Sequence, residues 1–236
     1  MKFRPSWVDL TYQAQFSRVL FELAAAPVKI LAAIHKVMPV AYGITSADLS
    51  VVPGTAISDV HAKVRLFNGN ASIDVTADSL SAQFNNPVGP DDGAIIQNCL
   101  RLALEALAEA VGHFDIKEET VTLRMFAELI GQPDAHSFLR QIAGQQHLYP
   151  VVGAAESGSQ MVPNLQFELI NDSDRWSSYW SIARAIRSPK EVFISTTTRF
   201  LLGSKFADIN QKADHIRGLF TDFLGRIGLQ PEPKAT

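Results

Sequence analysis

The sequence predicts an α+β protein in which helices pack on one face of an antiparallel sheet. Runs that alternate apolar and polar residues, which is the period of a half-buried strand, recur along the chain. Two longer stretches carry apolar residues at helical spacing, and each follows a group of such strands. The order strand, helix, several strands, helix occurs twice. We therefore predict two similar halves, at residues 1–116 and 117–229, and a disordered tail at residues 230–236.

The first half begins with a strand and a helix that a proline interrupts. Apolar and polar residues alternate over residues 8–16, and helical spacing follows over residues 17–37. Pro27 lies inside this helical stretch, where a proline removes a backbone donor and clashes with the preceding turn, so we expect a break there. Residues 47–51 alternate again and predict a short strand.

An Asn68-Gly69 pair predicts a hairpin in the middle of the first half. It lies between alternating runs at residues 60–66 and 73–77, and both of its residues tolerate a positive φ. Alternation at residues 80–84 predicts a further strand after the hairpin.

Asp91 and Asp92 predict the beginning of the clearest helix in the chain. Acidic residues favour a helix N-terminus because they cap free amides and meet the positive end of the helix dipole. Gly112 is a natural end for this helix. Its apolar stripe consists of Ile95, Ile96, Cys99, Leu100, Leu102, Ala103, Ala106, Leu107, Ala110 and Val111.

The second half is predicted to repeat the element order of the first. Its predicted strands cover residues 121–127, 165–169 and 192–198. Pro133 and Asp134 begin a short predicted helix, and residues 153–160 are rich in Gly and Ser, which predicts a flexible stretch. A closing helix is predicted over residues 205–226.

Residues 172–188 fit a helix and a strand about equally well. Trp176, Tyr179 and Trp180 have the spacing of a helix face, whereas Trp176, Ser178 and Trp180 have the spacing of a strand face. The repeated element order favours a strand.

The same segment, within residues 175–190, contains the candidate binding residues. They are Arg175, Trp176, Tyr179, Trp180, Arg184 and Arg187. Arginines pair with phosphates or carboxylates, and aromatic side chains stack on bases or fill protein pockets. The alternative is that the aromatic residues belong to the core and the arginines to a solvated face, which the sequence alone leaves open.

The sequence predicts a protein that is not an enzyme and has no cofactor and no metal. Its six histidines are scattered without a His-x-x-x-His pair, and no Gly-x-Ser-x-Gly pattern occurs. The single cysteine, Cys99, excludes an intrachain disulfide and lies in an apolar stripe, where burial is favoured over nucleophilic activity.

Composition and charge exclude further classes of protein. The chain has 236 residues, 47% of them hydrophobic, and a formal net charge of −3, which does not suit a generally cationic binder of nucleic acid or membranes. The longest apolar stretch, residues 19–40, is interrupted by charged residues and prolines, so no membrane partner is expected. The basic start lacks the apolar run of a signal peptide, and we expect a cytoplasmic protein.

Three passages carry a family resemblance: residues 64–81, residues 121–126 and residues 192–229. The first contains Asp78-Ser79-Leu80-Ser81 after the hairpin, and the second contains Leu123-Arg124 followed by Met125. This order resembles a sporadically distributed family of uncharacterised prokaryotic proteins with an Asp-x-Leu-Ser turn and a Leu-Arg-aromatic strand. Met125 stands where that family has an aromatic residue. The strand-rich halves with long helices also resemble the export chaperone SecB, which implies grooves that hold unfolded segments.

These observations favour a protein-binding or assembly module, such as a SecB-like chaperone or an accessory subunit of a prokaryotic operon. It would bind a protein partner or an unfolded client through sheet edges or an apolar groove, and a homo-oligomer is compatible with this interpretation. The second hypothesis is a nucleic-acid-associated accessory protein that uses the basic and aromatic cluster at residues 175–190. The third is a small-ligand pocket between the helices and the sheet.

Overall fold

The computed structural model describes residues 1–87, 92–131, 134–144 and 164–232. Asp91, Pro133 and the glycine- and serine-rich stretch at residues 153–160 lie outside the described residues. The strands are β1 (Lys2–Phe16), β2 (Leu49–Val52), β3 (His61–Leu66), β4 (Ala71–Val75), β5 (Ser79–Asn85), β6 (Ile116–Ile130), β7 (Leu165–Asn171), β8 (Trp176–Arg184), β9 (Glu191–Leu201) and β10 (Gln230–Pro231). The α-helices are α1 (Phe21–Ala25), α2 (Pro27–Val37), α3 (Asp92–Val111), α4 (Ala135–Ile142) and α6 (Ile209–Arg226). Short 3₁₀ turns are η1 (Val40–Tyr42), η2 (Ser46–Asp48), η3 (Ile57–Asp59) and η4 (Phe67–Gly69).

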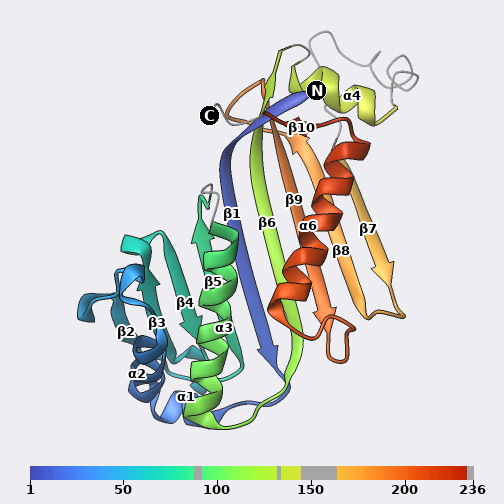
Figure 1. The fold of residues 1–236 in the computed structure, drawn as a ribbon. Helices are drawn as coiled ribbons and strands as arrows, with labels where there is room; N and C mark the ends of the chain where they lie inside the picture. The colour runs from blue at the N-terminus through green and yellow to red at the C-terminus, as the bar shows by residue number, and fades with distance from the viewer. Residues whose placement is uncertain (88–91, 132–133, 145–163, 233–236) are drawn as a thin grey trace.

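The described strands form one sheet in the order β2-β3-β4-β5-β1-β6-β9-β8-β7, with β10 added beside β1 (Figure 1). The long strands β1 and β6 pair along their length, from Lys2 opposite Ile130 to Phe16 opposite Ile116. Every pairing along this order is antiparallel, and β10 alone runs parallel to its neighbour β1. The predicted fold class, α+β with a large antiparallel sheet, is confirmed.

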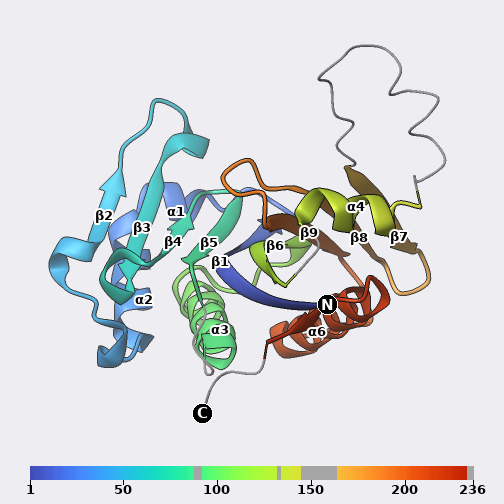
Figure 2. The ribbon, with the colours of Figure 1, turned by 90° about the horizontal axis from the view of Figure 1, so that it is seen from above.

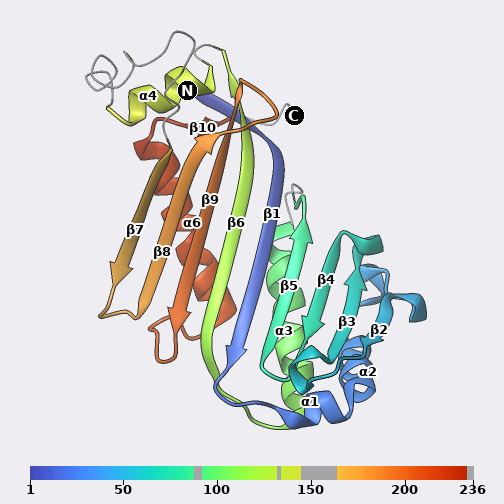
Figure 3. The ribbon, with the colours of Figure 1, turned by 180° about the vertical axis from the view of Figure 1, so that it is seen from behind.

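The helices α2, α3 and α6 cover one face of the sheet, with β1 lying between α3 and α6 when the molecule is seen from above (Figure 2). The buried apolar residues form two clusters on this face. One cluster lies beneath α2 and α3, and the other beneath α4 and the end of α6. The opposite face is uncovered by the described helices (Figure 3). None of the described helices is both long and apolar enough to cross a membrane.

Local sequence signals account for several element boundaries. Pro27 is the first residue of α2 and separates it from α1, which confirms the predicted break. Asn68 and Gly69 connect β3 to β4 with φ values of 55° and 88°, as the hairpin prediction requires.

Two boundaries differ from the predictions. The closing helix begins at Ile209 and not at residue 205, because the carboxylate of Asp208 accepts the backbone N–H groups of Asn210 and Gln211 and caps the helix there. The tail predicted to be disordered from residue 230 instead starts with β10. The N–H of Gln230 donates to the carbonyl of Met1, and that of Glu232 to the carbonyl of Phe3, so the free edge of β1 holds this segment.

Candidate ligand-binding site

A cavity of about 250 Å³ lies between α3 and α6, above the central strands β1 and β6. Its lining is almost entirely apolar. The apolar side chains are Leu10, Ile96, Leu100, Val121, Leu123, Ile209, Ala213, Ile216 and Phe220. The two helices stand on the same face of the sheet with the central strands between them (Figure 2), so the cavity is walled by helices and floored by strands.

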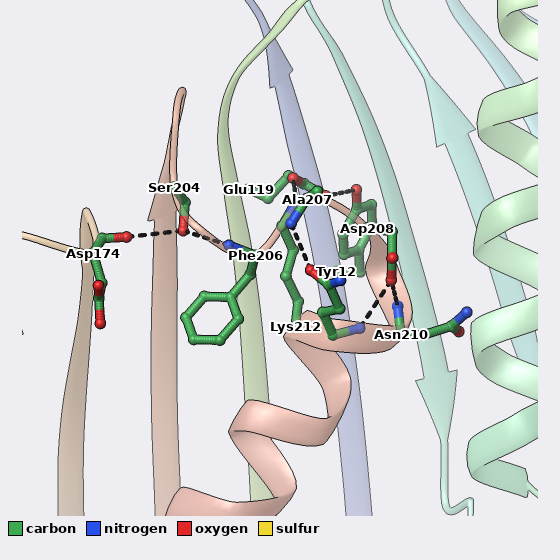
Figure 4. A network of polar contacts seen from close by, with 10 residues as sticks. Tyr12, Glu119, Asp174, Ser204, Phe206, Ala207, Asp208, Asn210 and Lys212 are labelled. Carbon is green, nitrogen blue, oxygen red and sulfur yellow. Dashed lines mark hydrogen bonds and ion pairs between the residues drawn. The ribbon is translucent and has the colours of Figure 1, made fainter.

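A buried polar group of three side chains lies at this cavity. The hydroxyl of Tyr12 donates a hydrogen bond to Glu119 Oε1 at 2.6 Å, and the ammonium of Lys212 forms an ion pair with Glu119 Oε2 (Figure 4). Tyr12 is 0% exposed, Glu119 8% and Lys212 7%. Buried charges of this kind are retained only when they are paired, and both oxygens of the carboxylate are satisfied.

The residue periods of β1, β6 and α6 place these three side chains on surfaces that face one another. Tyr12 and Glu119 lie on the helix-facing sides of β1 and β6, in phase with the apolar residues of those strands. Lys212 lies three residues after Ile209 and four before Ile216, so it belongs to the face of α6 that packs on the sheet. The cap at Asp208 fixes where α6 begins and therefore where Lys212 points.

The electrostatics of the group keep Tyr12 as a neutral donor. Burial raises the pKa of the Tyr12 hydroxyl well above its usual value, and the charge of Glu119 and the hydrogen bond to it raise the pKa further.

Lys212 also lines a second cavity of about 280 Å³, between the start of β6 and the segment that joins β9 to α6. The ion pair thus separates two cavities, and the larger apolar surface lies on the α3 side. The α3 side therefore suits an apolar guest.

The predicted binding residues on β8 do not form one surface. Successive residues of a strand point to opposite faces, so Trp176 and Trp180 face α6, whereas Tyr179 faces the uncovered side and is 42% exposed. Trp180 is 1% exposed and its ring lies 4.5 Å from that of Phe223, measured between centroids. The segment is a strand, and its tryptophans are part of the packing beneath α6.

The arginines of the predicted site are also separated. Arg187 pairs with Glu191 at 2.7 Å and lies over the ring of Phe126 at 3.8 Å. Burial alone would raise the pKa of Glu191, but the hydrogen bonds from Arg187 and Ser6 and the charge of Arg187 outweigh it, and its pKa is lowered. Arg175 lies in the turn before β8 with a φ of 57°, and Arg184 ends β8 opposite Val192.

The structure also bears on two other candidates from the sequence, the thiol of Cys99 and a possible metal site. Cys99 is 0% exposed in α3, and burial raises the pKa of its thiol to about 12, so it remains protonated. Within the described ranges, no cluster of three or more His, Cys, Asp or Glu side chains could hold a metal ion.

Sequence reasoning did not single out Tyr12, Glu119 or Lys212. The sequence does contain a signal for them, because Lys212 interrupts the apolar stripe of a predicted helix and Glu119, two residues before a predicted strand, is in phase with the inward residues of that strand. A lone cation and a lone carboxylate at inward positions of neighbouring elements indicate a buried pair.

His215 is surrounded by aromatic rings and is expected to make stability depend on pH. Its ring centroid lies 4.5 Å from that of Trp176 and 4.3 Å from that of Phe206. Burial lowers the pKa of His215, and the positive charge of Lys205 lowers it further, against the opposing effect of Asp174. The folded-state pKa therefore lies below the unfolded value of about 6.5, and the unfolded chain binds the proton first as the pH falls.

We expect the thermal unfolding midpoint to fall as the pH is lowered from about 7.5 to about 5.5. His215→Phe should flatten this dependence, whereas replacing the exposed His113 by Gln should leave it unchanged. Thermal melts of the three proteins across this range provide the measurement. An equal pH dependence in the wild type and His215→Phe would contradict the assignment.

The comparisons with known proteins add little to these observations. No family model matches the sequence, and the search of curated proteins found no match. A solved structure described as Methanococcus jannaschii TBP aligns with 96% of this chain and 98% of its own, at 12% sequence identity and a TM-score of 0.32. A likeness of that size carries no argument about fold or function. The resemblances to the uncharacterised prokaryotic family and to SecB stay predictions.

Proposed function

We propose that this protein is a non-enzymatic protein-binding module that holds an apolar segment of a partner or unfolded client in the cavity between α3 and α6. The observation that carries the proposal is the cavity itself, which has an apolar lining and lies between two long helices. Clefts of this shape accept the apolar face of a peptide, whose large side chains act as anchors. An engineered cavity of roughly 150 Å³ binds benzene, so about 250 Å³ has room for one large side chain.

The strand order supports the predicted doubling of the chain and, with it, a SecB-like layout. From β1 outwards the neighbours are β5, β4, β3 and β2, and from β6 outwards they are β9, β8 and β7, so the first half has one strand more. In chain order, β5 is followed by the long helix α3 and β9 by the long helix α6. Both helices lie on the same face of the sheet. We infer that the two halves, residues 1–116 and 117–229, derive from one repeated unit and that their helices jointly form the walls of the cavity. The proposal places the protein in the cytoplasm.

Nucleic-acid binding by the cluster at residues 175–190 has less support. Arg187 is the arginine of the cluster that pairs with a carboxylate, and several other basic side chains on the uncovered sheet face also lie beside carboxylates. The pairs are Lys63–Asp74, Arg124–Asp9, Arg187–Glu191 and Arg199–Glu118. A polyanion would have to displace these carboxylates, whereas a phosphate-binding surface normally presents unpaired cations.

Filling the cavity is expected to abolish binding while leaving the fold intact. Ala213 lines the cavity, so Ala213→Leu should occupy the space intended for a partner's side chain. The wild type should slow the aggregation of reduced α-lactalbumin, measured by light scattering, and Ala213→Leu should lose most of that effect. Ala108 is exposed on α3, and Ala108→Leu is the matched control that should behave as the wild type.

Thermal melts of both variants show whether they fold. Failure of the wild type to slow aggregation at a several-fold molar excess would overturn the proposal. Equal suppression by the wild type and a folded Ala213→Leu would show that clients bind elsewhere, for example along the exposed edge of β7.

A further inference from the structure

The charged residues that line the α3–α6 cavity are all cationic. Among the described residues, Lys212 and Arg217 contribute to its wall, and no carboxylate does. The ammonium of Lys212 is engaged by Glu119 in the interior. Arg217 is therefore the cation that a guest would meet as it enters.

Arg217 lies across the opening between the two helices. Its Nη1 donates to Asp214 Oδ1 at 2.9 Å on α6 itself. Its Nη2 points towards α3 and lies 3.9 Å from the position that a Cβ would occupy on Gly93. A guanidinium has five N–H donors in a planar fork that matches a carboxylate, and the one printed hydrogen bond of Arg217 uses Nη1, so a carboxylate at the cavity mouth could accept from the Nη2 side. The side chain of Arg217 is 63% exposed, which allows a partner to reach it.

We propose that the bound segment carries a carboxylate next to its apolar side chain, with the apolar group in the cavity and the carboxylate on Arg217. This inference rests on the proposed function, since it names the chemistry of the partner segment held there. A protein segment suits the site better than a free small molecule, because about 250 Å³ is smaller than the roughly 300–1,000 Å³ of typical small-molecule sites. An exposed arginine–carboxylate pair changes affinity by up to about five-fold, and it also selects against basic segments.

Two dyes distinguish the contribution of the apolar cavity to binding from that of the charge on Arg217. 8-Anilinonaphthalene-1-sulfonate and N-phenyl-1-naphthylamine share one ring system, and only the first has an anionic group. Both should bind the wild type by fluorescence titration, the sulfonate more tightly. Arg217→Gln should weaken binding of the sulfonate about two- to five-fold and leave binding of the neutral dye unchanged. Asp214→Asn, which frees Arg217 Nη1, should tighten the sulfonate, and the exposed Arg226→Gln is the control on the same helix.

The outcomes separate this inference from the function on which it rests. The carboxylate preference would be overturned if both dyes bound with equal affinity, or if Arg217→Gln left the affinity for the sulfonate unchanged. Either result would still agree with binding in the apolar cavity. If neither dye binds, or if both bind equally to Ala213→Leu, the cavity itself is not a binding site and the proposed function fails. A fatty acid recovered in stoichiometric amount by solvent extraction of the purified protein would identify a lipid occupant and overturn the protein segment.

Discussion

Replacement of Lys212 by Ala is expected to lower the free energy of unfolding by about 3–5 kcal/mol. Lys212 is 7% exposed, and its loss leaves the carboxylate of Glu119, itself 8% exposed, buried without its cation. The hydrogen bond from Tyr12 remains but does not neutralise the charge. Urea titration of the wild type and Lys212→Ala, with unfolding followed by circular dichroism, provides the measurement.

The control is a lysine with the same kind of partner on the surface. Lys36 pairs with Glu109 at 2.9 Å, but the two side chains are 70% and 57% exposed, so Lys36→Ala should cost less than about 1 kcal/mol. Replacing the whole group by apolar residues, with Tyr12→Phe, Glu119→Leu and Lys212→Met together, should recover much of the loss. If Lys212→Ala lowered the free energy of unfolding as little as Lys36→Ala does, the ion pair between Lys212 and Glu119 would have to be open to water.

The local elements were predictable because their signals lie within a few residues of one another. Asn68-Gly69 specifies the turn between β3 and β4 through its positive φ values, and Pro27 can occupy only the first turn of a helix. The apolar stripe from residue 95 to residue 111 defined α3 through its period. Each of these features is a property of the chain alone, independent of what packs against it.

The pairing of β1 with β6 and the face of β8 required long-range information. The paired residues of the two central strands are 100 to 128 residues apart in the sequence, from Phe16 opposite Ile116 to Lys2 opposite Ile130, and no local pattern in either strand identifies its partner. On β8, the spacing of Trp176 and Trp180 fits both the helical period and the strand period. The strand was decided by the hydrogen-bonded partners on either side, β7 and β9, and by α6, which covers the tryptophans.

The same dependence on partners explains why the buried group of Tyr12, Glu119 and Lys212 was missed. Each residue is unremarkable in its own element, and the signal arises only when β1, β6 and α6 are known to meet. The cluster at residues 175–190 shows that proximity in the sequence is not proximity in space. Neighbours on a strand point to opposite faces, so a dense local set of arginines and aromatics is divided between the core and the uncovered face.

Trp180→Ala is expected to destabilise the protein by about 3–5 kcal/mol, because Trp180 belongs to the core beneath α6. Its ring centroid lies 4.5 Å from that of Phe223 and 5.8 Å from that of Phe220, and the side chain is 1% exposed. Truncation leaves a cavity between β8 and α6 that rigid strand and helix backbones cannot close. Tyr179→Ala, one residue away on the uncovered face, should cost less than about 1 kcal/mol.

Urea denaturation of these two variants therefore decides between the two interpretations of the aromatic cluster. If Trp180 served mainly to bind a partner, its removal would leave stability unchanged and abolish binding, and Tyr179 would behave in the same way. A large loss of stability for Trp180→Ala alone places the tryptophan in the packing that holds α6 on the sheet. Since α6 carries Lys212, Ala213 and Arg217, that packing also fixes the wall of the cavity. Mild destabilisation by a smaller change, Trp180→Phe, should then weaken dye binding without any contact between residue 180 and the dye.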